Sequence, residues 1–231
     1  TEIYTLSLHD ALPISENALT DTANYVFASA DEDEPKATLF SNDNLTIYGA
    51  GTLTLVAQYN DAISTDDGLL INGARITIKA VDDGIRGKDY LVIQDASLEI
   101  AVGGDGLKSD DDNAEKPGQV QISKSTLVIN SAGDAISAEG GVRILSGDFT
   151  LNSGDASFDP DSVSAKAIKG LASVVIDGGV FVVDAMDDAI HSNGDVTVND
   201  GNFTIASGDD GLHADLSLTI NSGKIYIKES Y

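Results

Sequence analysis

The chain has 231 residues, of which 13 are lysine or arginine and 38 are aspartate or glutamate, so its formal net charge at pH 7 is −25. This charge excludes nucleic acid as a partner, because phosphate backbones are bound by clustered basic residues. The absence of cysteine excludes disulfides and thiolate metal sites. No run approaches the roughly 20 consecutive apolar residues of a membrane-spanning helix. Apolar residues make up 42% of the chain but aromatic residues only 6%, so a core must be built from small and β-branched side chains.

Residues 1–14 differ in pattern from everything that follows. They resemble the conceptual translation of a sequencing-library adapter, and we predict that residues 1–15 are a non-native leader. A genuine first strand at residues 3–8 is the alternative, although it lacks the glycines and aspartates of the later sequence. We expect residues 16–36 to form a linker or a partial coil, and residues 37–231 to form one domain that is cut at both ends.

A short string of an acid, a small residue and Ile or Leu recurs along the rest of the chain. The period is 22 residues, with two insertions of 7 and 10 residues, and a lysine replaces the acid in one repeat. The apolar member of the string is Ile63, Ile85, Leu107, Ile136, Ile168, Ile190 and Leu212. Two further apolar pairs per repeat keep the same register, each with the alternation of a β-strand. Each repeat therefore contains two clear strands and one short strand that carries the acidic string.

Three short strands in every 22 residues predict an all-β fold, a right-handed single-stranded parallel β-helix. One such unit cannot bury its own apolar face, so successive coils stack with strands about 4.8 Å apart. Phe149, Phe181 and Phe203 occupy one column and should stack in the core. The insertions, at residues 110–118 and within residues 152–166, should be loops. A calcium-binding β-roll would repeat every nine residues, and a leucine-rich repeat would place a helix in every unit, so neither fits.

Stacking also places acidic residues above one another along one corner. The column contains Asp61, Asp83, Asp105, Asp134, Asp188 and Asp210, and Asp82, Asp187 and Asp209 double it. Carboxylates about 5 Å apart destabilise one another unless they are hydrogen-bonded to turn amides, bound to a cation or partly protonated. Hard oxygen ligands favour Ca²⁺, and the predicted ligands are Asp82, Asp83, Asp105, Asp110, Asp187, Asp188, Asp209 and Asp210. The alternative for each aspartate is that it caps a turn by bonding a backbone N–H.

Basic residues gather on the face next to this column. The side chain after each Ile or Leu should point outward, and the outward positions include Arg86, Lys88, Lys108, Lys169, His191 and His213. Cations beside aspartates that can hold Ca²⁺ suit the repeated carboxylates and hydroxyls of an acidic polysaccharide, so these six residues are the candidate carbohydrate-binding set. The alternative is that the cations only neutralise the aspartate column.

Four strings, at residues 35–41, 82–89, 104–110 and 187–194, resemble a bacterial family of carbohydrate-binding domain-containing proteins. The resemblance extends from about residue 31 to residue 231. It implies a right-handed parallel β-helix similar in fold to pectate lyases, with bound calcium, that binds cellulose and polygalacturonate at the bacterial surface. Alanine at the usual signature glycine (Ala62, Ala135 and Ala189) and the Lys166 string without aspartate depart from the pattern, which argues against a regular column of metal sites.

We therefore expect a monomeric, non-catalytic protein that binds acidic or cellulosic polysaccharide with the help of Ca²⁺. The expected location is the bacterial cell surface or the medium, with any export signal outside this sequence. One alternative is a calcium-dependent, pectate-type polysaccharide lyase, in which Ca²⁺ acidifies the C5–H of a uronate and Arg86, beside Asp83 and Asp105, removes the proton. Another is a structural stalk or adhesin whose columns serve stability alone.

Overall fold

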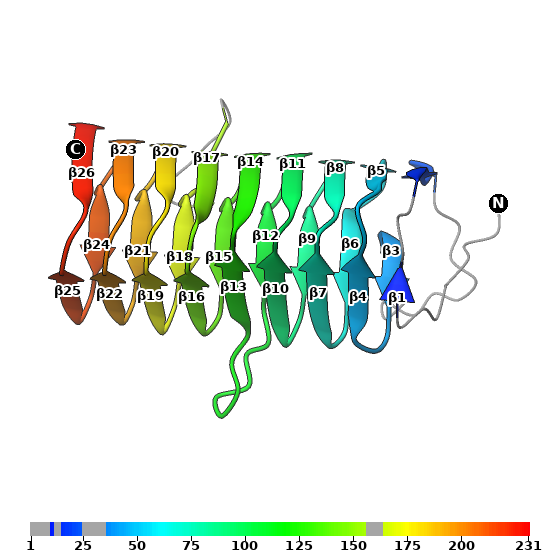
Figure 1. Cartoon of the computed structure of the whole chain (residues 1–231), viewed down its shortest axis with the longest axis horizontal. Coiled ribbons are helices and arrows are strands. Elements are labelled where there is room, and N and C mark those ends of the chain that lie inside the picture. The colour runs from blue at the N-terminus through cyan, green and yellow to red at the C-terminus, as the bar shows by residue number, and fades with distance from the viewer. Residues whose placement is uncertain (1–9, 12–14, 25–35, 156–163) are drawn as a thin grey trace.

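A computed structural model of the protein describes residues 10–11, 15–24, 36–155 and 164–231. These residues form 26 strands in three parallel sheets, which we call sheets A, B and C. The chain runs through one strand of sheet C, one of sheet A and one of sheet B before it begins the next coil (Figure 1). The protein is therefore a right-handed parallel β-helix with three strands per coil, which confirms the fold predicted from the repeat.

Every strand pairs with its equivalents in the coils before and after it. Sheet A contains β1 (Asp10–Ala11), β4 (Leu45–Tyr48), β7 (Gly68–Asn72), β10 (Tyr90–Gln94), β13 (Gln119–Ser123), β16 (Gly141–Ile144), β19 (Ser173–Ile176), β22 (Asp195–Val198) and β25 (Ser217–Ile220). Sheet B contains β2 (Glu16–Thr20), β5 (Thr52–Ala57), β8 (Arg75–Ala80), β11 (Ser97–Val102), β14 (Ser125–Ser131), β17 (Gly147–Ser153), β20 (Val180–Ala185), β23 (Asn202–Ser207) and β26 (Lys224–Glu229). Sheet C contains β3 (Ala37–Ser41), β6 (Asp61–Thr65), β9 (Ile85–Gly87), β12 (Leu107–Ser109), β15 (Ile136–Ala138), β18 (Ile168–Gly170), β21 (Ile190–Ser192) and β24 (Leu212–Ala214).

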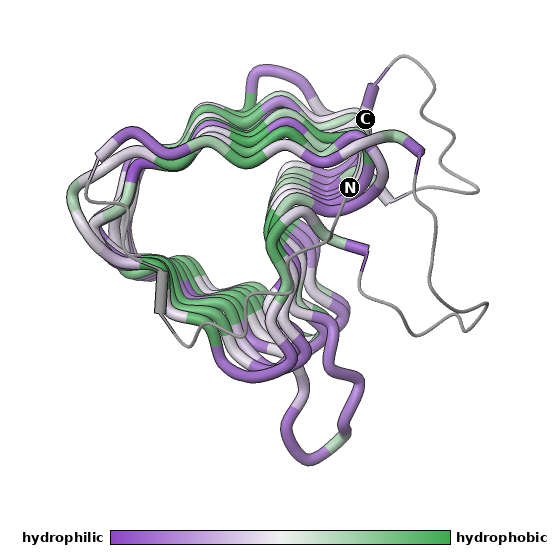
Figure 2. Tube along the Cα trace, turned by 90° about the vertical axis from the view of Figure 1, so that its right-hand side faces the viewer, coloured by the Kyte–Doolittle hydropathy of each residue, from purple (hydrophilic) through white to green (hydrophobic). Residues whose placement is uncertain are grey.

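The core is a continuous apolar interior enclosed by the three sheets. Seen along the solenoid axis, apolar positions line all three walls (Figure 2). Side chains alternate between this interior and the outside, as in β14, where every second residue is buried. The predicted phenylalanine column is confirmed, because the ring of Phe181 stacks on Phe149 with centroids 4.7 Å apart and on Phe203 at 4.5 Å.

The first insertion is a loop that projects from the solenoid between β12 and β13 (Figure 1). It is acidic and lies beside the turn between sheets C and A in the preceding coil, because Gln119 at its base pairs with Tyr90. The second insertion includes residues 156–163, which lie outside the described residues.

Only part of the amino-terminal region is described. Within the stretch predicted to be a leader, Asp10 and Ala11 pair with β4, while residues 1–9 and 12–14, and with them the alternative strand at residues 3–8, lie outside the described residues. Within the predicted linker or partial coil, β2 pairs with β5, and residues 25–35 lie outside the described set. The non-native origin of residues 1–15 and the three domain boundaries stay predictions.

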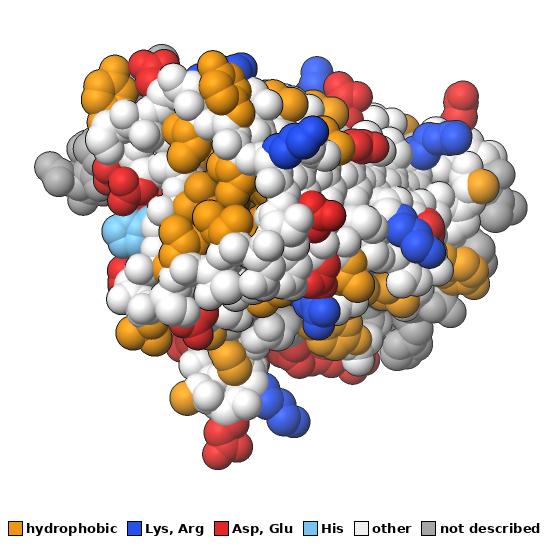
Figure 3. Space-filling model, turned by 60° about the vertical axis from the view of Figure 1, so that its left-hand side comes forward, with side chains coloured by type: hydrophobic (Ala, Val, Ile, Leu, Met, Phe, Trp, Pro, Cys, Tyr) orange, Lys and Arg blue, Asp and Glu red, His pale blue; other side chains and the backbone are white. Residues whose placement is uncertain are grey.

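The carboxyl-terminal end of the solenoid exposes apolar side chains. β25 and β26 are the last strands of their sheets, so their inward-facing residues are covered on one side only. Leu218 is 47% and Ile220 52% exposed there, and apolar side chains gather on this end of the molecule (Figure 3). In the described part of the chain, no helix has the length and apolarity needed to cross a membrane.

Candidate functional site

The aspartates of the repeated string form a ladder at the start of the sheet C strands. The Oδ1 atom of a carboxylate accepts a hydrogen bond from the backbone N–H of the equivalent residue in the next coil. The donors and acceptors are Asp83 and Asp61 (3.1 Å), Asp105 and Asp83 (2.7 Å), Asp134 and Asp105 (2.8 Å), Lys166 and Asp134 (2.8 Å), and Asp210 and Asp188 (3.0 Å). One oxygen of each acceptor thus joins two coils, which is the capping role that the sequence left open.

Lys166 interrupts this ladder. Its backbone N–H continues the pattern, but it has no carboxylate to offer Asp188, whose N–H bonds Asp187 Oδ1 at 2.8 Å instead. The Lys166 ammonium bonds Asp187 Oδ2 and lies 3.8 Å from Asp188 Oδ2. Burial is the largest single influence on the pKa of Asp187 and would raise it, but the hydrogen bond and charge of Lys166, together with the backbone N–H groups of Asp188 and Ala165, lower it overall. The acidic column is therefore broken at the coil whose string lacks an aspartate.

Basic side chains form a second column alongside the aspartates. The register of sheet C aligns Ser64, Arg86, Lys108, Ser137, Lys169, His191 and His213, as predicted. Lys108 Nζ lies 3.1 Å from the Oδ2 atoms of both Asp83 and Asp105, and Lys169 Nζ lies 3.1 Å from Asp134 Oδ2. These aspartates use Oδ1 for the backbone and Oδ2 for a cation, so the two columns neutralise each other.

Lys108 neutralises the negative charge of Asp83 and Asp105 only in part. Burial lowers the pKa of Lys108, but the charges and hydrogen bonds of Asp105 and Asp83 outweigh burial and raise it. Burial, and then the charge of Asp134, raise the pKa of Asp105 to about 6, although Lys108 opposes this shift. One ammonium group between two carboxylates stabilises the charged form of both only in part.

The least balanced aspartates lie at the amino-terminal part of the column. Burial raises the pKa of Asp61 to about 7, with a further contribution from the charge of Asp83. Burial and Asp83 also raise the pKa of Asp82. The basic column contributes Ser64 rather than a cation to the coil of Asp61. Oxygens of Asp61, Asp82 and Asp83 lie within 4.8 Å of one another, so this cluster can hold a cation.

Arg86 is held by its neighbours in the adjacent coils. Its Nε atom donates to both carboxylate oxygens of Asp110 at 2.9 Å, and its Nη1 donates to Ser64 Oγ at 3.2 Å. Burial is the largest single influence on the pKa of Arg86 and would lower it, but the hydrogen bond and charge of Asp110, together with the charges of Asp61 and Asp66, raise it overall. The carboxylate of Asp110, predicted as a Ca²⁺ ligand, is therefore an ion-pair partner, and the guanidinium is already hydrogen-bonded on two sides.

Five of the predicted metal ligands lie in two clusters of carboxylates. Asp82 and Asp83 lie in the Asp61 cluster, and Asp187, Asp188 and Asp209 also bring ligand oxygens within 4.8 Å of one another. Basic side chains face most of the predicted ligands, in both clusters and outside them: Lys108 faces Asp83 and Asp105, Arg86 faces Asp110, Lys166 faces Asp187 and Asp188, and His213 faces Asp210. The sequence prediction omitted Asp61, whose burial becomes visible only when the coils are stacked.

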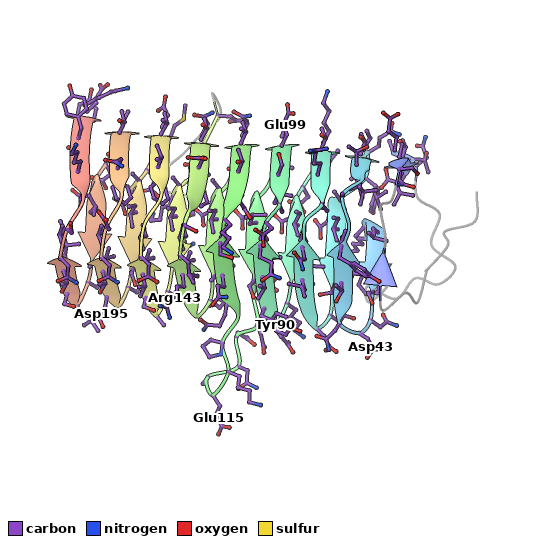
Figure 4. The ribbon with its side chains drawn as sticks, viewed as in Figure 1. Asp43, Tyr90, Glu99, Glu115, Arg143 and Asp195 are labelled. Atoms are coloured by element: carbon purple, nitrogen blue, oxygen red, sulfur yellow. The ribbon has the colours of Figure 1, made fainter. Side chains whose placement is uncertain are left out.

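Tyr90 is a candidate binding residue that the sequence analysis missed. Its ring lies flat against the backbone of Gly68 in the preceding coil, where an added Cβ would lie 1.9 Å from the ring Cζ. Its hydroxyl donates to Asn44 Oδ1 at 2.9 Å, two coils away, and 39% of the residue is exposed. Tyr90 and the loop that carries Glu115 lie on the same side of the solenoid (Figure 4). A glycine one repeat before an aromatic residue, here Gly68 before Tyr90, is the sequence signal that could have identified this exposed ring.

Lys88 lies at the turn that joins β9 to β10, two residues before Tyr90. Its backbone N–H donates to Thr65 O at 3.3 Å, which holds the turn against the preceding coil. Its half-buried side chain has no ion pair among the described residues, unlike Arg86 and Lys108. The turn between sheets C and A therefore combines a rigid aromatic face with a positive charge that has no carboxylate partner there.

Comparison with known proteins gives three matches. A family described as "Carbohydrate-binding domain-containing protein" matches residues 11–211. A relative of the same description from Acetivibrio thermocellus is 42% identical over 65 residues, which are 28% of this chain and 23% of the relative, so the alignment spans about a quarter of the relative's length. A solved structure, described as a polysaccharide lyase-like protein from C. thermocellum in a gadolinium derivative, aligns over 92% of this chain and 94% of its own, with a TM-score of 0.47 and 15% identity.

Proposed function

Since this chain belongs to the carbohydrate-binding domain-containing family, we propose that it binds an acidic polysaccharide at the turn between sheets C and A, without cleaving it. The family match confirms the resemblance predicted from the four sequence strings. The observation that carries the location is Tyr90, whose exposed ring is held flat by Gly68 and Asn44. A rigid aromatic face loses little conformational freedom when a sugar ring stacks on it.

A lysine at this turn, unpaired among the described residues, can bind an acidic ligand, although the loop between β12 and β13 beside it is acidic. The chain as a whole would repel a polyanion, because its net charge is −25. Lys88 has no ion pair within the described structure, so its ammonium group is available to a uronate carboxylate. Arg86 and Lys108 contribute positive potential beside it, although both are paired with aspartates.

We propose that Ca²⁺ binds at the cluster of Asp61, Asp82 and Asp83, away from the Tyr90 ring. The carboxylates of Asp61, Asp82 and Asp83 fit a hard cation, because three oxygen ligands lie within 4.8 Å of one another and the ion pair of Asp83 with Lys108 balances only part of their charge. A cation held there would remove negative charge from the start of sheet C and reduce the repulsion of an acidic glycan. Such glycans are extracellular polymers, so we place the protein at the cell surface or in the medium.

The test is depletion of the protein by insoluble polygalacturonate and by cellulose, each with Ca²⁺ or with chelator. We expect depletion by polygalacturonate, stronger with Ca²⁺, and no ultraviolet absorbance from unsaturated uronate. Tyr90→Ala should weaken binding about tenfold, as expected for one lost aromatic contact, whereas Tyr90→Phe should retain most of it.

Two matched controls separate the proposed location from general effects. Tyr48→Ala removes another partly exposed tyrosine of sheet A, and Lys79→Glu makes the same charge change as Lys88→Glu on sheet B. Only Tyr90→Ala and Lys88→Glu should weaken binding. Equal effects of all four variants would contradict this location, depletion by cellulose alone would contradict the acidic ligand, and unsaturated product would show a lyase.

Calcium is tested on the same protein. After chelator treatment, added Ca²⁺ should raise the melting temperature of the wild type and have a smaller effect on Asp61→Asn. An equal rise in the two proteins would show that this cluster does not hold the ion.

A further inference from the structure

The last two complete strings of the repeat carry histidine at the position that is lysine, arginine or serine in the earlier strings. β21 and β24 are paired so that His191 lies beside His213, with ring centroids 4.9 Å apart. The Nδ1 atom of His191 lies 2.7 Å from Asp188 Oδ2, and that of His213 lies 4.0 Å from the same oxygen. Two imidazole nitrogens and one buried carboxylate oxygen thus converge, all within 4.8 Å of one another.

These separations are close to those of a tetrahedral metal site. Zinc–ligand bonds of about 2.0 to 2.1 Å place neighbouring ligand atoms about 3.3 Å apart. The distances from Asp188 Oδ2 to the Nδ1 atoms of His191 (2.7 Å) and His213 (4.0 Å) lie on either side of this separation. Rotations of the two histidine rings can therefore bring the three ligand atoms onto one ion. Asp188 is 3% exposed and its Oδ1 is bonded to the Asp210 N–H, which fixes the position of the carboxylate.

The outer nitrogen of each histidine is oriented by an oxygen of the residue that follows its strand, two positions further along the chain. His191 Nε2 lies 3.2 Å from Asn193 Oδ1, and His213 Nε2 lies 3.1 Å from Asp215 Oδ1. If each Nε2 donates its hydrogen there, each Nδ1 presents a lone pair to the cluster. Oxygen acceptors on the outer nitrogen are the usual second sphere of metal-bound histidine, since they fix the tautomer and the ring.

We propose that Asp188, His191 and His213 bind one Zn²⁺ ion that joins the last two coils of sheet C. Imidazole nitrogen with one carboxylate favours zinc and its neighbours over Ca²⁺, which prefers a shell of oxygen ligands. Asp210 Oδ2 lies 2.9 Å from His213 Nδ1, so Asp210 or a water molecule completes the coordination. This site is distinct from the Asp61 cluster and does not depend on polysaccharide binding.

The alternative is that the histidines only replace lysine in the neutralising column. Lys108 shows that a lysine at this register position pairs with the aspartates of two successive coils. His213→Lys therefore retains a cation for Asp188 and Asp210 while it removes a metal ligand. A merely structural role would leave this variant equivalent to the wild type in every metal measurement.

The experiment is isothermal titration of untagged, chelator-treated protein with Zn²⁺, together with the visible spectrum of the Co²⁺ form. We expect one ion per chain, the intense absorption of four-coordinate Co²⁺ and a higher melting temperature with Zn²⁺. His213→Lys should lower the affinity at least about 100-fold, and Asn193→Ala, which removes an orienting oxygen, about tenfold. His9→Ala, which changes the third histidine of the chain, should have no effect.

Absence of Zn²⁺ uptake by the wild type, or equal uptake by wild type and His213→Lys, would overturn the proposal. The melting temperature of metal-free His213→Lys shows whether the variant is folded, so loss of the fold cannot be mistaken for loss of the site. Zn²⁺ uptake and depletion by polysaccharide are measured in separate experiments, so failure of one proposal is distinguishable from failure of the other.

Discussion

Two columns run along the solenoid at the same spacing, one inside and one outside. Inside, Phe149, Phe181 and Phe203 stack on one another, and repetition of one residue is sufficient because apolar rings gain contact with each other. Outside, repeated aspartates repel one another, so each needs a backbone N–H for one oxygen and a cation for the other. Repetition alone stabilises an apolar column, whereas a charged column requires a complementary column beside it.

The largest loss of stability is expected in the inner phenylalanine column. Phe181→Ala removes the middle ring of the inner column and should lower the free energy of unfolding by about 3–5 kcal/mol, because the surrounding coils can collapse only in part. Urea unfolding followed by circular dichroism measures this change. Phe181→Leu, which retains apolar volume, should cost less than half as much, and equal losses would indicate that stacking contributes more than burial.

The next largest effect is expected at the centre of the charged column. Lys108→Met leaves the facing oxygens of Asp83 and Asp105 without a counter-charge, so it should lower the free energy of unfolding by about 2 kcal/mol at about pH 8. The loss should shrink at about pH 5, which is below the pKa of about 6 of Asp105, because protonation of that carboxylate removes its repulsion of Asp83. Lys79→Met, at an exposed position of β8, serves as the control and should change stability by less than about 0.5 kcal/mol. A loss that is the same at both pH values would argue for packing of the lysine stem instead.

A smaller change, this time a gain in stability, is expected when the charge of Asp61 is removed. Its folded-state pKa of about 7 exceeds the ordinary value of 3.8, so the folded protein keeps a proton that the unfolded chain releases between those two values. Stability therefore falls as the pH rises through this window and stays reduced above it. Asp61→Asn keeps the Oδ1 acceptor for the Asp83 N–H and removes the charge. It should raise the free energy of unfolding by about 1–2 kcal/mol at about pH 8 and leave it unchanged at about pH 4.

Chemical unfolding across this pH range, in the presence of chelator, gives the measurement. Asp200→Asn, an exposed aspartate outside the column, is the matched control and should show the same pH profile as the wild type. A destabilised Asp61→Asn protein at high pH would mean that the carboxylate is stabilised in its charged form.

The smallest effect is expected for an ion pair outside the two columns. Arg143 lies on β16 of sheet A (Figure 4). It pairs with Asp177, the residue after β19, at 2.9 Å, and its side chain is 58% exposed. Solvent screens such a pair, so Arg143→Ala should lower the free energy of unfolding by less than about 0.5 kcal/mol. A double-mutant cycle with Asp177→Ala isolates the pairwise contribution. A coupling energy as large as the effect of Lys108→Met would mean that this exposed ion pair stabilises the protein as much as the charged column does.

The sequence by itself determined the fold and the two columns. A period of 22 residues places equivalent side chains one above another, so the parallel strands, the phenylalanine stack and the register of Arg86 with Lys108 could all be predicted. The physical reason is that one coil cannot bury its own apolar face, and stacking in register is the way to bury it.

Only the tertiary structure decided which charges are balanced and which side chains are presented. Asp61 and Asp105 occur in similar strings, but their neighbours differ because one coil contributes Ser64 and another contributes Lys108. Tyr90 is held by Gly68 and Asn44, which precede it by one and two coils. Periodicity fixes which residues are neighbours, but burial, the choice of hydrogen-bond partner and the orientation of a ring depend on the size and charge of each neighbour, which vary from coil to coil.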